Sequence, residues 1–185
     1  MEFVYHLKPA KLKGKSLLPL SKLEEKYPEL HKQEVAKYSD RSEGPEKPIK
    51  CLNVKWKDVV NLSTINPILL LSVAELIGNE THPAVIFRIP ISKLKNKPFC
   101  LFTDFDGKEK YEPMTVKEYR ECHEIPAATI QHYLESKEEG EQPLVFEGVP
   151  HILVADEIDI SDVEVIRYNP KNLFALASMF VSLTT

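Results

Sequence analysis

The segment NPILLLSVAELIG, residues 66–78, constrains the fold most, because it carries the signals for the start and the end of one helix. Asn66 is a preferred N-cap, Pro67 suits the first helical position, and Gly78 favours the left-handed conformation that ends a helix. The residues between them are apolar on nearly every side. We therefore expect this helix to be buried and to pack against a sheet.

The rest of the chain mixes predicted strands and helices without regular alternation. Alternating or continuous apolar segments predict strands at residues 2–7, 54–63, 84–91, 98–104, 143–148, 151–156 and 163–168. Other helices are expected over 21–38 with a break at Pro28, after the capping-box pair Thr115 and Glu118, and from Pro126 onward. This pattern predicts an α+β fold with flanking helices and either two small sheets or one strongly bent, mainly antiparallel sheet.

A length of 185 residues suits a single domain, residues 1–185. Residues 39–50 are polar and contain glycine and prolines, so they predict an irregular loop suited to ligand binding. Residues 170–183 predict an apolar C-terminal helix, and its apolar run is about half the roughly 20 residues that a membrane-spanning helix needs. We therefore expect no membrane association.

The three cysteines are odd in number and widely spaced, which favours reduced thiols and a cytoplasmic location. The net charge of −4 argues against a general nucleic-acid binder. Residues 1–57 carry 13 basic and 8 acidic side chains, a net charge of +5, which leaves 11 basic and 20 acidic side chains, or −9, for residues 58–185. The basic third favours either a phosphate-bearing ligand or a solvated charged surface. The acidic remainder allows an alternative function, that of a non-enzymatic interaction protein with an acidic surface for a basic partner.

Residues 121–132 concentrate groups that bind metals or act as nucleophiles in other proteins. His123 and His132 are nine positions apart and do not share a helix face at the i, i+4 spacing, so we expect no metal site. A hydrolase-like site on Cys122, His123 and Glu124 is a further alternative, although adjacent side chains point apart. The chain also lacks the glycine-rich phosphate-binding motifs.

Three segments distant in the sequence together resemble the ADP-ribosyltransferase-like fold. They are VYHLKPAKLKGKSLLPL with His6 on the first strand, LST at residues 62–64, and HILVADEIDISDVEVI at residues 151–166, which the resemblance treats as a closing hairpin. The superfamily includes RNA 2′-phosphotransferases and toxins that ADP-ribosylate thymidine in DNA. The match covers about half of the chain, and it depends on the order and spacing of the three segments.

The resemblance implies NAD as the cofactor, or an ADP-ribose-bearing ligand, bound in one cleft. His6 would bond a ribose hydroxyl, Ser63 or Thr64 would pack beside the nicotinamide, and Arg41 would reach the pyrophosphate. Residue types alone also allow an ordinary interpretation, because Ser and Thr suit any strand-to-helix turn and a strand histidine is often a surface residue.

The sequence departs from the family at a decisive position. Transferring members commonly place Glu just before the LV of the last hairpin, where this chain has His151. An imidazole does not stabilise an oxocarbenium-like cation as a carboxylate does, so Glu147 or Glu157 would have to replace it. The resemblance therefore implies either a transferase with His6, His151 and Glu147 as catalytic residues and a macromolecular acceptor, or a catalytically degenerate domain that binds a nucleotide. Phosphotransferase-like chemistry is a third possibility.

Overall fold

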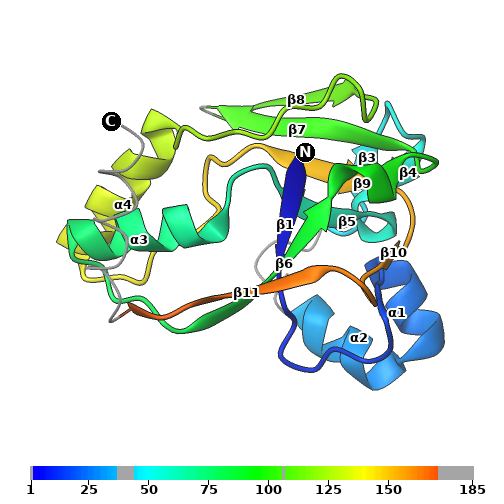
Figure 1. Cartoon of the computed structure of the whole chain (residues 1–185), viewed down its shortest axis with the longest axis horizontal. Helices are drawn as coiled ribbons and strands as arrows, with labels where there is room; N and C mark the ends of the chain where they lie inside the picture. The colour runs from blue at the N-terminus through cyan, green and yellow to red at the C-terminus, as the bar shows by residue number, and fades with distance from the viewer. Residues whose placement is uncertain (1, 37–43, 106, 171–185) are drawn as a thin grey trace.

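The computed structural model describes residues 2–36, 44–105 and 107–170, and it shows an α+β fold (Figure 1). The main sheet has seven strands in the order β11-β6-β1-β5-β9-β7-β8, and every neighbouring pair is antiparallel. The strands are β1 (Phe3–Leu7), β5 (Val60–Ser63), β6 (Ala84–Pro90), β7 (Phe99–Phe105), β8 (Lys108–Pro113), β9 (His151–Val154) and β11 (Glu164–Tyr168). Two small antiparallel ribbons pair β2 (Ser16–Leu17) with β10 (Ile158–Asp159) and β3 (Pro48–Ile49) with β4 (Val54–Lys55).

The main sheet changes direction where β1 meets β5. These two strands share a single residue pair, Tyr5 with Ser63, whereas β1 pairs with β6 over its whole length from Phe3 to Leu7. In Figure 1 β1 runs nearly at right angles to β7 and β9. The structure therefore corresponds to one strongly bent antiparallel sheet, accompanied by the two ribbons.

The helices lie in two pairs on opposite sides of this sheet (Figure 1). They are α1 (Leu20–Lys26), α2 (Pro28–Val35), α3 (Pro67–Ile77) and α4 (Ala127–Glu139), with short 3₁₀ turns η2 (Trp56–Asp58) and η3 (Ile91–Leu94). The break predicted at Pro28 is confirmed, as are both ends of α3. The Asn66 side chain accepts a hydrogen bond of 3.0 Å from the Ile68 N–H, and Gly78 has φ of 98°.

Strand alternation separates the buried side chains of the sheet into two groups. Val4, Leu62, Phe87 and Ile152 belong to one buried cluster, together with residues of η3. Tyr5, Ile86 and Tyr168 face the opposite side and pack with Leu71 of α3. Neighbouring residues of β1 therefore have their side chains on opposite faces of the sheet, which decides the position of His6.

Three sequence-based expectations were wrong in detail. Residues 143–148 contain no strand, because residues 145–148 form a turn in which the Glu147 N–H donates to the Leu144 carbonyl at 3.0 Å. Thr115 donates to the Glu118 carboxylate through its N–H and its hydroxyl, at 2.8 and 2.7 Å, but a turn follows instead of a helix. Residues 151–166 are not a hairpin, because β9 pairs with β5 and β7 whereas β11 lies on the far edge beside β6.

The loop predicted at 39–50 is only partly described, and its last part pairs as strand β3, with Pro48 and Ile49 opposite Lys55 and Val54. The predicted C-terminal helix at 170–183 lies beyond Pro170, outside the described residues. Among the helices that the structure describes, none is both long and apolar enough to cross a membrane.

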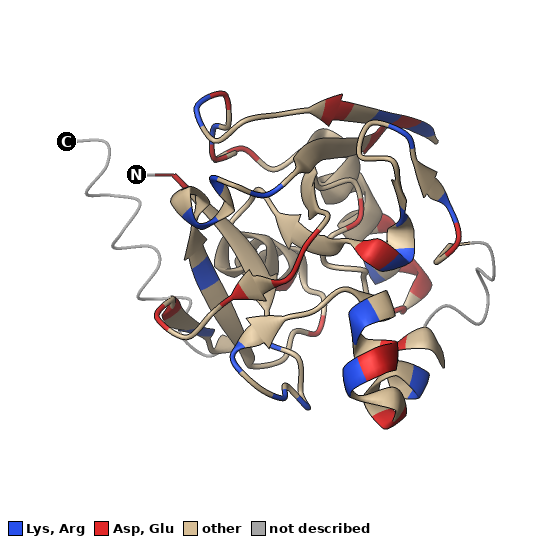
Figure 2. Ribbon diagram, turned by 90° about the vertical axis from the view of Figure 1, so that its right-hand side faces the viewer, with Lys and Arg blue, Asp and Glu red and all other residues tan. Residues whose placement is uncertain are grey.

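Part of the charge asymmetry is compensated inside the molecule. Lys22 and Lys26 of the basic N-terminal third pair with Asp156 and Glu157, at nitrogen–oxygen distances of 2.9 and 3.1 Å. Figure 2 shows Lys, Arg, Asp and Glu interspersed on the helices at the lower right. The basic and acidic parts of the chain therefore face each other at this contact.

Candidate functional site

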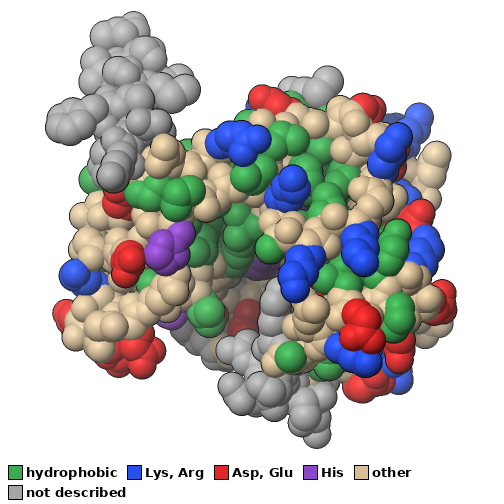
Figure 3. Space-filling view, turned by 90° about the horizontal axis from the view of Figure 1, so that it is seen from below, with side chains coloured by type: hydrophobic (Ala, Val, Ile, Leu, Met, Phe, Trp, Pro, Cys, Tyr) green, Lys and Arg blue, Asp and Glu red, His purple; other side chains and the backbone are tan. Residues whose placement is uncertain are grey.

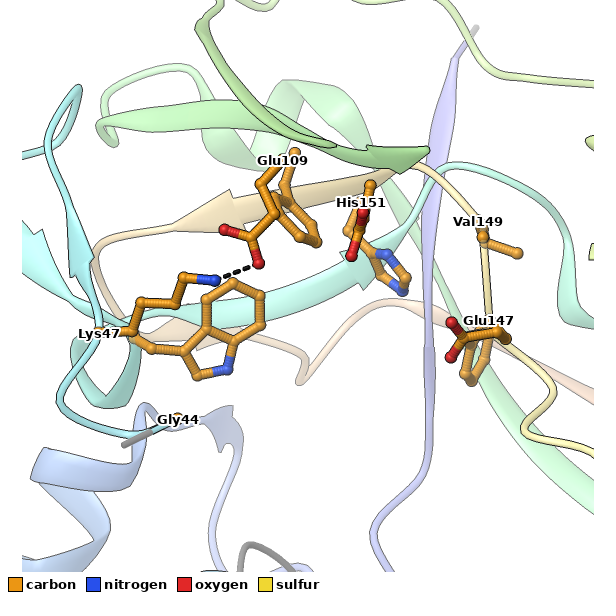
Figure 4. A pocket seen from close by; sticks show the side chains of 11 residues that line it. Gly44, Lys47, Glu109, Glu147, Val149 and His151 are labelled. Atoms are coloured by element: carbon orange, nitrogen blue, oxygen red, sulfur yellow. Dashed lines mark hydrogen bonds and ion pairs between the residues drawn. The ribbon is translucent and has the colours of Figure 1, made fainter. Parts of the chain in front are cut away.

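A cavity of about 290 Å³ opens beside His151, at the start of β9 (Figure 4). It forms where β7 and β9 meet the β3–β4 ribbon and the turn that precedes β9. Its walls are Gly44, Lys47, Trp56, Phe102, Asp104, Glu109, Phe146, Glu147, Gly148, Val149 and His151. We call this cavity the His151 pocket. Residues far apart in the sequence thus surround one space.

Aromatic rings line the His151 pocket in two edge-to-face pairs. Trp56 and Phe102 have ring centroids 5.3 Å apart at an interplanar angle of 79°. Phe146 and His151 have centroids 5.9 Å apart at 68°. Tyr111 supports Phe102 with its centroid 5.0 Å away. These pairs give the pocket apolar ring surfaces suited to a planar or apolar ligand group.

His151 is positioned by the sheet itself, because it pairs with Ser63 on β5 and with Phe102 on β7. Burial lowers the pKa of the imidazole to about 4, although a backbone hydrogen bond at Val149 acts in the opposite direction. The side chain is therefore neutral at pH 7. A neutral imidazole can donate or accept a hydrogen bond to a ligand, but it carries no charge with which to hold a phosphate.

Three carboxylates line the same pocket. Glu109 forms an ion pair with Lys47, and Figure 4 shows this pair on one side of His151 and Glu147 on the other. Asp104 has a buried Oδ1 with no hydrogen-bond donor in the part of the chain that is described. Glu147 is exposed. Among the described hydrogen bonds none joins His151 to a carboxylate, so no acid–base pair is assembled around the imidazole.

Ser63 and Thr64 do not line the His151 pocket. The Ser63 hydroxyl donates to the Ile65 carbonyl at 2.7 Å and accepts from the Ile65 N–H at 3.1 Å. The Thr64 hydroxyl donates to the Pro150 carbonyl at 2.9 Å. Both side chains are at least 97% buried, with exposed fractions of 3% and 2%. They therefore hold the strand-to-helix turn together, as the ordinary interpretation of LST allowed.

His6 lies in a different pocket. It follows Tyr5, whose cross-strand partner Ser63 is the partner of His151, so the His6 side chain belongs to the opposite face of the sheet. The second cavity has about 180 Å³ and is lined mainly by apolar side chains, six of them leucines, with His6, Lys13, Glu34 and Trp56 also among its walls. We call it the His6 pocket. The expectation of a single cleft over His6, Ser63, Thr64 and His151 is therefore wrong, although Trp56 lines both pockets.

Other predicted residues lie elsewhere. Arg41 falls outside the described residues. Glu157 pairs with Lys26 near the other end of β9, so it does not replace the missing carboxylate beside His151. Cys122 donates to the Glu124 carbonyl at 3.2 Å, and the side chain of His123 is exposed. The Cys122 region therefore shows no nucleophile and base in contact.

The sequence did not indicate four of the side chains that line the His151 pocket, namely Trp56, Phe102, Asp104 and Glu109. Trp56 is the only tryptophan of the chain, and the apparent turn DFDGKE at 104–109 contains two of the three pocket carboxylates. Neither signal indicated that these residues would share a cavity. The described residues contain no group of three or more His, Cys, Asp or Glu side chains that could hold a metal ion.

Comparisons with known proteins add no family to this picture. A scan against protein-family models, a search of curated proteins and a search of solved structures each gave no match to the chain.

Proposed function

We propose that the protein is an ADP-ribosyltransferase-like domain that binds NAD or another ADP-ribose-bearing nucleotide, with a planar ring of the ligand in the His151 pocket. This proposal rests on the composition of the pocket wall. Aromatic rings stand on two sides of one cavity beside a neutral histidine and Glu147, two of the residues that the family resemblance singles out. Such rings can stack against a base or a nicotinamide, and this contact requires no hydrogen bonds to the polar edge of the ligand ring.

A ligand larger than one ring would have to extend beyond the His151 pocket, which is at the small end for a whole ligand. Trp56 is the one described residue that lines both this pocket and the His6 pocket. Lys13 lines the His6 pocket and is exposed, so it offers an ammonium group to a phosphate. Figure 3 shows a hollow in the face seen from below, with hydrophobic side chains in it and Lys and Arg side chains along its right-hand side. This supports a ligand with both rings and phosphates.

Binding is better supported than group transfer. Cleavage of a glycosidic bond to nicotinamide develops positive charge on the ribose, which a fixed carboxylate stabilises. Glu147 lines the pocket, but it is exposed and no described contact fixes its carboxylate against His151. We therefore expect a domain that holds the nucleotide and transfers ADP-ribose slowly or not at all.

Isothermal titration calorimetry with NAD, ADP-ribose and AMP tests the proposal. Because a ligand at 100 times its dissociation constant stabilises the folded state by about 2.7 kcal/mol, the melting temperature should also rise. Phe146→Ala should weaken NAD binding about tenfold by removing one ring, whereas Leu144→Ala, an exposed leucine outside the pocket, should leave it unchanged. No binding of NAD and ADP-ribose at millimolar concentration would reject the proposal and favour the non-enzymatic interaction protein.

A nicotinamide-release assay then separates binding from transfer. Wild-type protein that binds NAD but releases no nicotinamide would identify a catalytically degenerate domain. Release at saturating NAD that Glu147→Gln abolishes would instead show that Glu147 replaces the missing carboxylate.

A further inference from the structure

We infer that the His151 pocket selects a positively charged organic group, a pyridinium or quaternary ammonium, over a neutral group of the same shape. This inference rests on the proposed function only in taking this pocket as the ligand site. It deepens that proposal by naming the charge of the group that enters.

The first argument is the charge of the pocket walls. Asp104, Glu109 and Glu147 supply three carboxylates, and Lys47 is the one cationic side chain among the described residues that line the pocket. Lys47 is already paired with Glu109. Asp104 and Glu147 have no ion-pair partner in the described part of the chain, so the described walls of the pocket carry a net negative charge that a cationic ligand group would balance.

The second argument is the state of Asp104. Its Oδ1 is buried, and no donor within the described residues bonds it. A buried carboxylate oxygen without a partner is costly, so its environment favours the arrival of a positive charge. Such a charge in the His151 pocket lies within a cavity that Asp104 itself lines.

The third argument is the aromatic surface. Trp56, Phe102 and Phe146 line the cavity, and the faces of aromatic rings attract cations, with tryptophan the strongest. Aromatic rings around one cavity are the surroundings in which proteins bind quaternary ammonium groups. A bare metal ion fits less well, because it needs several oxygen or nitrogen ligands converging on one point, and no such group occurs among the described residues.

The neighbouring space has the same character. A third cavity of about 370 Å³ shares Asp104, Glu147 and Gly148 with the His151 pocket and adds Glu135 and His132. No Lys or Arg occurs among the described residues that line it. The negative potential therefore continues from one cavity into the next, and it would hold a cation at their common wall.

Two matched pairs of probes test the inference by calorimetry or chemical-shift titration at fixed ionic strength. 1-Methylnicotinamide is a pyridinium cation and nicotinamide is its neutral counterpart, whereas tetramethylammonium and tert-butanol differ in charge at nearly the same shape. We expect the cation of each pair to bind about tenfold more tightly. Equal affinities within both pairs, or tighter binding of the neutral members, would overturn the inference.

Substitutions identify the residues responsible for the preference for a cation. Asp104→Asn and Glu147→Gln should each reduce the ratio of cation to neutral affinity severalfold, while Glu138→Gln, an exposed position of α4 outside the pocket, should leave it unchanged. Wild-type selectivity retained in both pocket variants would place the cation elsewhere and so refute the assignment. Circular dichroism spectra and melting curves establish that each variant is folded.

The two proposals fail in different ways. Binding of 1-methylnicotinamide and tetramethylammonium without any binding of NAD or ADP-ribose would reject the nucleotide function and keep the cation site. Binding of NAD with no charge preference in either probe pair would keep the nucleotide function and reject the cation site.

Discussion

The two pockets that share Trp56 differ in the balance of polar and apolar side chains in their walls. The His151 pocket combines three carboxylates, an ion pair and aromatic rings, whereas the His6 pocket is mainly apolar, with six leucines beside Lys13 and Glu34. Both contain one of the histidines that the sequence singled out. The difference shows that the same residue type has a different role on each face of a sheet. His151 stands among groups suited to ligand chemistry, and His6 stands at the edge of an aliphatic surface.

Substitution of Trp56, which lines both pockets, should give the largest effect on stability. Trp56→Ala removes a half-buried indole from both pockets and from its packing against Phe102, so we expect the free energy of unfolding to fall by about 3 kcal/mol. Urea denaturation measures this loss. Trp56→Phe, which keeps a ring at the position, should recover more than half of it. Equal destabilisation by both substitutions would mean that the indole ring is not a packed wall.

Acid should destabilise the protein through the His151 pocket. The pKa of His151 is lowered from 6.5 to about 4 in the folded state, so the unfolded chain binds the proton more readily. The stability from this residue is fully present above pH 6.5, and it falls between pH 6.5 and pH 4 by at most about 3.5 kcal/mol, since each tenfold change in proton affinity corresponds to about 1.4 kcal/mol.

Urea denaturation of wild type and His151→Gln between pH 7.5 and pH 4 measures this dependence. The variant should be less stable at pH 7 and should lose less stability on acidification than wild type does. Parallel pH profiles for the two proteins would contradict a neutral, desolvated imidazole.

Two glycines with the same positive φ test the packing of the pocket wall. Gly107 and Gly148 both have φ of 70°, so alanine should cost about 1 kcal/mol at either position. A Cβ at Gly107 would meet nothing within 4 Å, but at Gly148 it would lie 3.1 Å from the Thr129 hydroxyl and 3.3 Å from the Thr129 nitrogen. Gly148→Ala should therefore cost about 1 kcal/mol more than Gly107→Ala in thermal unfolding. Equal costs would show that the turn at Gly148 moves freely away from α4.

The smallest effect on the His151 pocket should come from His6. Because its side chain lies on the opposite face of the sheet, His6→Ala should change the affinity for 1-methylnicotinamide less than threefold. Calorimetric titration of the variant checks this expectation, with Phe146→Ala as the variant in which affinity should fall. A tenfold loss in His6→Ala would mean that the two pockets act as one site.

Several parts of the fold followed from local sequence signals. The ends of α3, the break at Pro28 and the strands β1, β6 and β9 depend on capping groups, proline and side-chain alternation, which act within a few residues. The turn at 143–148 was misjudged because its apolar residues resemble those of a strand. Its conformation depends instead on contacts with α4, where the Tyr133 hydroxyl donates to the Val145 carbonyl at 2.5 Å.

The residues of the candidate site were likewise only partly predictable from the sequence. Sequence patterns indicated His151 and Glu147 and supplied an ordinary role for Ser63 and Thr64, which the hydrogen bonds of the turn confirm. They also suggested that His6 and His151 line one cleft. The family resemblance compares the order of segments along the chain, and it does not say on which face of the sheet each side chain lies. Trp56 and Asp104 gave no comparable signal, since nothing in their own neighbourhoods indicates a ligand.

By itself, then, the sequence determined the α+β class and the limits of its clearest helices, because these depend on interactions between near neighbours. It also placed His6 and Tyr5 on opposite faces, since alternation along a strand requires this. Only the tertiary structure decided which residues share a pocket. The pairing of β9 between β5 and β7, and the packing of the β3–β4 ribbon beside them, bring together side chains such as Lys47 and His151 that are more than a hundred residues apart, and no local rule fixes that arrangement.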